Sequence, residues 1–353
     1  MSQITRRELT LAGLASIVMA ASGRTIAQAS AMGTDSALWY VNPELRPAAL
    51  RMQAEAKMFP PVSSETLPSM RNRQWDTRAP LPDVPYAKKS IAGLGKAPDV
   101  AIYVVNARPG TSRPAILHTH GGGFITGSPS GDLINLQAIA QALDAVIVSV
   151  DYRLAPETRY DGSIDDNYAA LLWLSRNSAA LGADPRRIAV MGESAGGGHA
   201  ALLALTARDR GEVPLAFQCL TYPMLDDRTG TSRQVPAHVG TLVWTAASNK
   251  FGWQSFLGRA PGGATAPGGG VPARMSDLSN LPPCWIGVGS IDLFVQEDMD
   301  YARRLIDSGN LCELLVVPGA FHGFEMIAPD TGLAQSFKTA RLNALKRGLA
   351  IPN

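Results

Sequence analysis

The stretch Gly192-Glu193-Ser194-Ala195-Gly196 decides how this part of the chain must fold. Residues 187–191 before it, which are apolar after Arg187, predict a short buried strand, and the Ala- and Leu-rich residues 195–207 after it predict a helix. A serine at such a corner, with glycine two positions away on either side, sits on a sharp and strained turn where only glycine leaves room for the neighbouring backbone. The stretch therefore predicts that Ser194 points its hydroxyl outward where a strand gives way to a helix.

Strand-like apolar runs alternate with helical patterns over most of the 353 residues. Continuous apolar strands separated by helices are typical of a mostly parallel sheet that is covered on both faces. The sequence therefore predicts an α/β fold with a central, mostly parallel sheet flanked by helices. The expected strands are residues 100–105, 115–119, 145–150, 188–191, 216–221, 284–288 and 313–317, and the expected helices are residues 133–143, 165–176, 195–207 and 298–307.

Two helices near the end of the chain show an apolar face at helical spacing. We expect both faces to be buried. They consist of Met299, Ala302, Leu305 and Ile306 in residues 298–307, and of Leu333, Phe337, Ala340 and Ala344 in the final helix.

The alternation is interrupted twice, by residues 30–97, which are rich in Pro, Met and Ala, and by residues 223–280. An insertion at the carboxyl end of a strand can form a lid over the site below it. The aromatic side chains of the second segment, among them Trp244 and Trp253, either line a pocket under that lid or form the lid's own small core. The expected division is a helical cap from residues 30–97 (with short helices near 43–58 and 63–74) and 223–280, over a core from residues 98–222 and 281–353.

Residues 1–29 have the features of an export signal that is removed from the mature protein. The paired Arg6-Arg7, the uncharged residues 10–23 and the small residues Ala27-Gln28-Ala29 are typical of a twin-arginine signal, which directs a folded protein across a membrane. The apolar run is too short for a stable membrane span. A frayed amphipathic helix is the alternative. We expect an exported, periplasmic protein without stable membrane insertion.

Composition argues against several other functions. The formal net charge is only +2 and no basic stripe is present, which argues against a nucleic-acid partner. No glycine-rich nucleotide-binding loop of either common type occurs. Cys219, Cys284 and Cys312 lack the paired C-x-x-C spacing of a metal site and lie in apolar runs, so we expect buried free thiols. A bridge between Cys284 and Cys312 after export is the alternative.

Ser194 is a candidate nucleophile, which needs a base, an orienting acid and donors for an oxyanion. His322 follows the expected strand 313–317 and a short turn, at the edge of the sheet where a base would meet Ser194. His238 lies in the irregular insertion, and His199 lies on the helix that leaves the serine and cannot fold back to it. We therefore expect His322 to be the base, with a buried loop histidine as the alternative.

The orienting acid is expected to be Asp292, in the loop directly after the expected strand 284–288. The strongest alternatives, Glu297 and Asp298, lie at the start of the next expected helix. Acidic residues are common there because they interact favourably with the helix dipole. The remaining rivals lie at the edge of the insertion. These alternatives are Glu297 and Asp298 in the helix, and Asp226 and Asp227 in the insertion.

His120-Gly121-Gly122-Gly123 follows the expected strand 115–119. Glycines at this place let neighbouring backbone N–H groups point at one oxygen without interference from side chains. We expect the N–H groups of Gly122, Gly123 and Ala195 to form an oxyanion hole. An ordinary glycine-rich turn is the alternative.

Five motifs occur in a fixed order over about residues 98–350, and together they resemble the bacterial hormone-sensitive-lipase-like (family IV) carboxylesterases of the α/β-hydrolase fold. Glu193 stands where this family often has aspartate, and Gly198-His199 also departs from the usual pattern, so the substrate stays open. The motifs are His120-Gly121-Gly122-Gly123-Phe124, Asp151-Tyr152-Arg153-Leu154-Ala155-Pro156-Glu157, Gly192-Glu193-Ser194-Ala195-Gly196-Gly197, Asp292-Leu293-Phe294 and Phe321-His322-Gly323-Phe324.

The resemblance implies a cap made from N-terminal helices and the insertion after Tyr222-Pro223, no metal or organic cofactor, and short acyl esters as small-molecule substrates. Ser194 would attack the ester and form an acyl-enzyme, His322 would move the proton and Asp292 would orient His322. An amidase or arylformamidase with the same residues is one alternative, and a non-catalytic binding protein on this fold is another. The oligomeric state, including a homodimer, stays open.

Two further expectations concern the surroundings of the glycine loop. Residues 151–157 are expected to pack beside it as a structural turn rather than to touch substrate. The substrate pocket is expected to be narrow, because bulky side chains leave little room for a long acyl chain. The expected pocket residues are Phe124, Ile125, Trp244 and Trp253.

Overall fold

The computed structural model describes residues 38–55, 61–72 and 78–351. The chain divides into two units, Met1–Tyr40 and Val41–Asn353, and everything below concerns the second. The expected export signal at residues 1–29 lies outside the described residues. No helix in the described part of the chain combines the length and the apolar character needed to cross a membrane.

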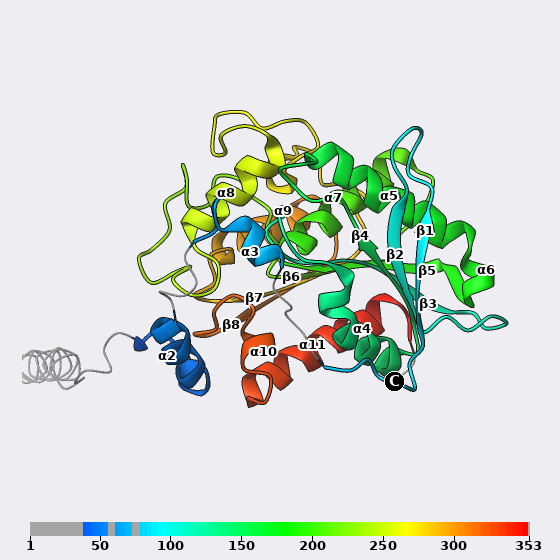
Figure 1. The fold of residues 1–353 in the computed structure, drawn as a ribbon, viewed down its shortest axis with the longest axis horizontal. Helices are drawn as coiled ribbons and strands as arrows, with labels where there is room; N and C mark the ends of the chain where they lie inside the picture. The colour runs from blue at the N-terminus through cyan, green and yellow to red at the C-terminus, as the bar shows by residue number, and fades with distance from the viewer. Residues whose placement is uncertain (1–37, 56–60, 73–77, 352–353) are drawn as a thin grey trace, which may run out of the picture. The chain divides into compact units, whose positions relative to one another are not determined.

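An eight-stranded sheet forms the centre of the second unit (Figure 1). Its strands lie in the order β1-β2-β4-β3-β5-β6-β7-β8. β2 runs antiparallel to both of its neighbours, and all other pairs are parallel, which confirms the expected mostly parallel sheet. The strands are β1 (Tyr86–Ile91), β2 (Val100–Val105), β3 (Arg113–Thr119), β4 (Val146–Asp151), β5 (Ala183–Glu193), β6 (Phe217–Thr221), β7 (Cys284–Gly289) and β8 (Cys312–Val317).

Apolar runs become central strands because the side chains on both faces are covered by helices. Every residue of β3, β6 and β7 is buried. All seven strands expected from the sequence are present, and β5 is longer than expected because it begins at Ala183. The parallel strands direct their carboxyl ends to one edge of the sheet, where the loops of interest begin.

The structure corrects the assignment of residues 30–97 to the cap, because β1 within this range belongs to the sheet. Five of the six residues of β1 are exposed, and only Ile91 is buried. Such a strand carries no apolar signal. Lys88 and Lys89 stand on this edge strand, where charged side chains discourage pairing with another chain.

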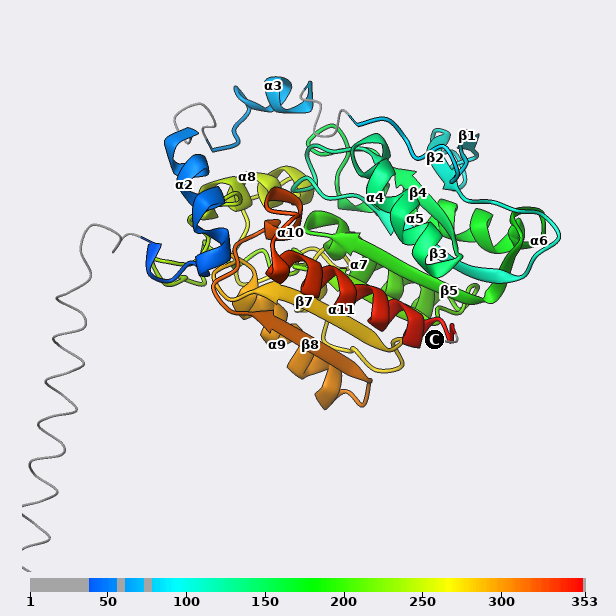
Figure 2. The same cartoon turned by 90° about the horizontal axis from the view of Figure 1, so that it is seen from below.

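Helices cover both faces of the sheet, as Figure 2 shows from below. α4 and α11 pack against each other on one face, and α5 and α7 pack against each other on the opposite face, which α9 also covers. These helices are α4 (Pro129–Leu143), α5 (Tyr160–Arg176), α7 (Ala195–Arg210), α9 (Val295–Asp307) and α11 (Gly332–Gly348), and the short helices α6 (Ser178–Leu181) and α10 (Phe324–Ile327) lie in loops.

The buried face of α9 differs from the expected one. Ala302 and Leu305 are buried as expected, but Met299 and Ile306 are exposed. Tyr301 and the carboxylic acids Glu297 and Asp298 take the buried positions instead, together with Val295. The expectation was wrong because buried acidic side chains are rare. A prediction from apolar positions alone therefore leaves Glu297 and Asp298 out and assigns the wrong face of the helix to the core.

The remaining helices come from the two segments that interrupt the alternation. The N-terminal segment forms η2 (Pro43–Leu45), α2 (Arg46–Glu55) and α3 (Leu67–Arg71), and α3 begins four residues later than expected. The insertion forms α8 (Ala246–Leu257) and η4 (Pro272–Arg274). The two segments touch, because the N–H of Val62 donates a hydrogen bond to the Ser248 hydroxyl on α8.

The beginning of the N-terminal segment also contacts the sheet's loops. The backbone N–H of Asn42 donates to the carbonyl of Gly319 over 2.9 Å, and its side-chain amide donates to the carbonyl of Pro318 over 3.2 Å. A carboxylate oxygen of Glu44 accepts from the N–H of Leu333 in α11. These contacts attach the N-terminal segment to the turn that follows β8.

The three cysteines are free thiols, as expected by default. Cys219 and Cys284 are buried and Cys312 is half-buried. Cys284 and Cys312 are partners in the register of β7 and β8. Burial raises the pKa of Cys219 to about 12, so this thiol stays protonated and behaves as a small apolar side chain.

Candidate active site

Ser194 lies on the tight turn between β5 and α7, as the glycine spacing predicts. Its φ is 58°, a left-handed conformation that a non-glycine residue adopts only under strain. A Cβ added to Gly192 would overlap the carbonyl of Gly196, and one added to Gly196 would overlap the carbonyl of Thr119. The glycines are therefore required by the close approach of three backbone segments.

Ser194, His322 and Asp292 form one hydrogen-bonded chain. Nε2 of His322 lies 3.0 Å from Oγ of Ser194, and Nδ1 of the same ring lies 2.8 Å from Oδ2 of Asp292. The three residues follow β5, β7 and β8 at the carboxyl edge of the sheet, and all are buried. The structure thus brings together the three residues that the sequence predicts as nucleophile, base and acid.

Asp292 has a second hydrogen-bond partner and a second buried carboxyl group, that of Asp298, as a neighbour. Its Oδ1 accepts a hydrogen bond from the N–H of Phe294 over 3.0 Å. Asp298 is fully buried nearby, and burial, followed by Glu297 and Asp292, raises its pKa well above the usual value. These causes disfavour a second negative charge beside Asp292.

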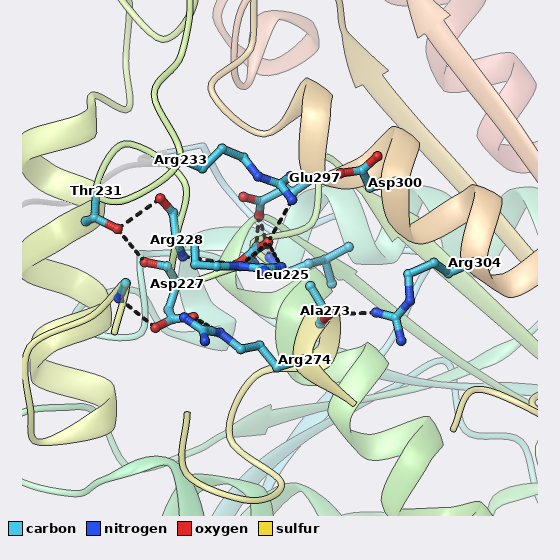
Figure 3. A network of polar contacts seen from close by, with 12 residues as sticks. Leu225, Asp227, Arg228, Thr231, Arg233, Ala273, Arg274, Glu297, Asp300 and Arg304 are labelled. Atoms are coloured by element: carbon cyan, nitrogen blue, oxygen red, sulfur yellow. Dashed lines mark hydrogen bonds and ion pairs between the residues drawn. The ribbon is translucent and has the colours of Figure 1, made fainter. Parts of the chain in front are cut away.

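Glu297, the other helical rival for the acid, contacts the start of the insertion (Figure 3). Its Oε1 accepts from the N–H of Leu225 over 2.6 Å and from the N–H of Asp226 over 3.1 Å. Burial, followed by Asp226, raises its pKa well above the usual value. Glu297 therefore anchors the start of the insertion.

The two remaining rivals also hold the insertion together (Figure 3). Asp226 is paired with Arg228 at 2.7 Å and with Arg233 at 3.4 Å. Asp227 is paired with Arg274 at 2.6 Å, which joins the two ends of the insertion. Both carboxylates are buried and their charges are compensated, so neither is available to orient His322.

The loop Gly121-Gly122-Gly123 lies beside Ser194. A Cβ on Gly121 would be 3.6 Å from the Cβ of Ser194. Gly122 and Gly123 have φ values of 122° and 60°, and within the described residues no protein group accepts a hydrogen bond from either N–H. Ala195 is the first residue of α7, so its N–H has no acceptor in the helix. The geometry leaves these three donors available at one side of Ser194.

Residues 151–157 support this loop, as expected. The Tyr152 hydroxyl donates to the carbonyl of His120 over 2.6 Å, and the two rings stack at 4.1 Å. The N–H of Ala155 donates to the carbonyl of Phe124 over 2.9 Å. Burial lowers the pKa of His120 to about 4, so its ring is neutral and serves packing.

Arg71 of α3 fastens the same region from the N-terminal segment. Its guanidinium donates to the carbonyls of Ile125 and Ala155, each over 2.8 Å, and pairs with the carboxylate of Glu157 at 2.7 Å. The hydrogen bond with Arg71 lowers the pKa of Glu157 to about 2. No pattern in the sequence predicts this contact, because the partners are far apart along the chain.

A buried charge network lies under the turn that carries Ser194. Glu193 contacts Nε2 of His118 at 2.9 Å and Nη1 of Arg341 at 3.1 Å. Burial alone would raise the pKa of Glu193, but His118 and Arg341 outweigh it, and the pKa is lowered. For His118, burial alone would lower the pKa, but Glu193 outweighs it, and the pKa is raised. The two opposite shifts favour the ionised forms of Glu193 and His118, and the contacts of Glu193 connect β5 to β3 and to α11.

Three of the four expected pocket residues are fully buried. Phe124 stacks on Phe256 at 3.9 Å and meets Trp253 edge-on at 5.0 Å. His199 completes this aromatic cluster, and burial lowers its pKa to about 3, so its ring is neutral. Ile125 is buried beside Phe124. This placement favours the alternative in which Trp253 belongs to the core under the insertion.

Trp244, the fourth expected pocket residue, lies against the glycine loop. A Cβ on Gly123 would overlap the Trp244 ring. Its indole N–H donates to Oδ1 of Asn249 over 3.1 Å, and the amide of Asn249 donates to the carbonyl of Thr229 over 2.8 Å. Trp244 therefore bounds the space next to the available N–H groups.

Comparison with protein families agrees with the geometry. A family model described as the alpha/beta hydrolase fold matches residues 116–326. The carboxylesterase NlhH of Mycobacterium tuberculosis is 37% identical over 241 residues, which cover 67% of this chain and 74% of that protein. An ethyl acetate hydrolase of Pseudomonas putida is 30% identical over 223 residues, 61% of this chain and 67% of that protein.

Two solved structures with the same architecture are esterases by title. A bacterial heroin esterase matches with a TM-score of 0.77 and 33% identity, over 89% of this chain and 99% of that chain. The esterase LipW of Mycobacterium marinum matches with a TM-score of 0.72 and 30% identity, over 90% of this chain and 98% of that chain. Both structural matches extend beyond residues 116–326, the part that the family model matches.

Proposed function

This chain belongs to the α/β-hydrolase family, in its hormone-sensitive-lipase-like branch of carboxylesterases, and we propose that Ser194, His322 and Asp292 carry out its ester hydrolysis. The protein is a serine ester hydrolase. The assignment of the three roles depends on one observation: a single imidazole, that of His322, bonds Ser194 with one nitrogen and Asp292 with the other.

The proposed acylation step follows from these distances. Oγ of Ser194 attacks the ester carbonyl carbon while Nε2 of His322 takes its proton, and the imidazolium then gives that proton to the leaving alcohol. Asp292 keeps the other ring nitrogen protonated and stabilises the charged ring. The N–H groups of Gly122, Gly123 and Ala195 stabilise the negative oxygen of the tetrahedral intermediate. Water, activated by His322, then hydrolyses the acyl-enzyme.

Replacement of the nucleophile tests this assignment. Ser194→Ala should lower kcat by about 10⁴–10⁶-fold while the melting temperature stays near that of the parent. Stoichiometric labelling by an organophosphate should occur in the parent and be absent in the variant. Turnover within tenfold of the parent, or undiminished labelling, would show that another residue is the nucleophile.

We propose short-chain carboxylic esters as substrates. The Trp244 ring against Gly123 supports this, since it restricts the space beside the proposed oxyanion hole. A panel of p-nitrophenyl esters should give kcat/KM values that are highest from about acetyl to hexanoyl and lower at dodecanoyl. Matched anilides test the amidase alternative. A palmitoyl optimum, or faster turnover of anilides, would contradict the proposal.

We also propose that residues 1–29 export the folded enzyme to the periplasm. The paired arginines and the small residues at 27–29 support this. In a bacterial host with a twin-arginine pathway, the parent should reach the periplasm with residues 1–29 removed. The double variant Arg6→Lys, Arg7→Lys should stay in the cytoplasm, uncleaved. Equal periplasmic amounts of both proteins would contradict the proposal.

A further inference from the structure

The segment Thr221-Tyr222-Pro223-Met224 forms hydrogen bonds with the backbone of Ser194. The N–H of Ser194 donates to the carbonyl of Thr221 over 2.9 Å, and the N–H of Met224 donates to the carbonyl of Ser194 over 2.9 Å. Both hydrogen-bonding groups of the strained residue are thereby held by this one segment, which leads from β6 into the insertion.

Tyr222, within this segment, also contacts His322. Its ring centroid lies 4.6 Å from that of the imidazole, with an angle of 58° between the planes. Phe294 meets the imidazole edge-on at 5.3 Å. Both aromatic side chains are buried. His322 therefore contacts two buried aromatic rings, in addition to its bonds to Ser194 and Asp292.

The Tyr222 ring is fixed at its far end. Its hydroxyl donates a hydrogen bond to Oε1 of Glu325 over 2.7 Å. Glu325 is buried on α10, in the loop that follows His322. Burial raises the pKa of Tyr222 well above its usual value, so the phenol stays protonated and remains a donor. The ring cannot turn without breaking this bond.

The backbone of Tyr222 is strained. Its φ is 35°, in the left-handed region that a side chain with a Cβ disfavours, and its N–H donates to the carbonyl of Gly287 over 2.7 Å. Strain of this kind persists only where surrounding contacts over-determine the conformation, and it concentrates at functional sites. Pro223 follows immediately and fixes the next φ.

These contacts point beyond the three residues of the hydrolytic mechanism. We propose that Tyr222, anchored by Glu325, is a positioning residue that holds the His322 ring in register with Ser194. This inference rests on the proposed role of His322 as the base. Tyr222 acts in two ways: its ring restricts the imidazole to the plane that reaches Oγ of Ser194, and its π-electrons, with the ring centroids 4.6 Å apart, favour the protonated imidazole formed during acylation.

Removing the ring and removing the hydroxyl should have separable effects. Tyr222→Leu should lower kcat by about tenfold with little change in KM, since ester binding does not need the ring. It should also move the acid limb of the kcat/KM pH profile to lower pH by about half a unit, because the protonated imidazole loses a favourable neighbour. Tyr222→Phe keeps the ring and should lower kcat by about threefold.

Variants of Glu325 test the anchor. Glu325→Gln keeps an oxygen that accepts from the Tyr222 hydroxyl, so it should retain most of the turnover that Glu325→Leu loses. Combining Tyr222→Phe with Glu325→Leu should cost less than the product of the two separate losses, because both break one hydrogen bond.

Tyr168 provides the matched control. Its hydroxyl donates to a carboxylate oxygen of Glu212 over 2.9 Å, on α5 and away from His322. Tyr168→Phe should change the melting temperature but neither kcat nor the pH profile. The inference is overturned if Tyr222→Leu and Tyr222→Phe also change only the melting temperature. Failure of the proposed function gives a different result, namely full activity in Ser194→Ala.

Discussion

The turn around Ser194 and the insertion at 223–280 are held in different ways. At the turn, backbone lies against backbone: Gly192 and Gly196 have no space for a Cβ, and the carbonyl and N–H of Ser194 are both bonded. The insertion is held by charged side chains, with Asp226 and Asp227 each paired with arginine. Apart from α8 and η4, most of the insertion is irregular.

This difference indicates how each region responds to change. Overlap between backbones cannot be relieved by choosing another rotamer, so substitutions at the turn should act on folding or on turnover in an all-or-none manner. Ion pairs between long side chains allow adjustment, and irregular surface stretches accept new side chains. We expect the turn to determine the reaction and the insertion to determine which ester fits.

The largest effect expected is on the acid. Asp292→Asn should lower kcat by about 10⁴-fold with little loss of stability, because the asparagine amide favours the wrong tautomer of His322. Glu297→Gln, which keeps an acceptor for the insertion's backbone, should leave kcat within about threefold of the parent. Steady-state kinetics and thermal unfolding on both variants distinguish the roles. A crippled Glu297→Gln beside a mild Asp292→Asn would make Glu297 the acid.

The next largest effect is the difference in stability when a glycine is replaced by alanine at the turn and in the insertion. In Gly196→Ala the new Cβ meets the carbonyls of Thr119 and His120, so the free energy of unfolding should fall by about 3 kcal/mol or more. A Cβ on Gly268 in the insertion would meet no heavy atom within 4 Å, and Gly268→Ala should stay within about 0.5 kcal/mol of the parent. Equal stability in denaturant titrations would remove the contrast.

The insertion's two tryptophans should differ in kind. Trp244→Ala opens space beside Gly123 and should shift the optimum of the chain-length profile towards longer acyl groups, with about a tenfold gain or loss on individual esters. Trp253→Ala creates a cavity beside Phe124 and should lower the melting temperature. Profiles and melting temperatures of both variants decide this. An unchanged profile in both variants would mean that neither tryptophan shapes the pocket.

The smallest effect concerns the pair between Arg71 and Glu157. Because the pKa of Glu157 is lowered from 4.5 to about 2, ionised Glu157 stabilises the folded protein above pH 4.5, and this contribution is lost as the pH falls towards 2. The difference in the free energy of unfolding between the parent and Glu157→Gln should follow that course. Glu157 is 63% exposed, so the difference should be small and should shrink in salt. A difference that is independent of pH would exclude the charge as its origin.

Much of the fold and of the hydrolytic site follows from the sequence because their signals are local. A buried parallel strand is a continuous apolar run, and the residue after its carboxyl end lies at one edge of the sheet whatever the loops do. Ser194, Asp292 and His322 each stand just beyond such a run. Their meeting therefore needs no knowledge of side-chain packing.

Other features escape the sequence because they depend on contacts between distant elements. Nothing in the local sequence marks Tyr222, Glu325 or Arg341 as part of the site. Their contacts form only when the residues after β6, α10 and α11 come together in the fold. The strand β1 is exposed and carries no apolar run. The buried face of α9 includes Glu297, whose partners on the insertion no periodicity can reveal.

The two hydrogen bonds from Asn42 to the Pro318-Gly319 turn define how much of the N-terminus the enzyme can lose. His322 lies three residues beyond Gly319, so the two hydrogen bonds from Asn42 stabilise the loop that carries the proposed base. Cleavage at the proposed boundary after Ala29 would keep Asn42 and both hydrogen bonds. Proteolysis that removes Asn42 would remove them. A shortened recombinant form should therefore begin before Asn42 if it is to keep these two hydrogen bonds.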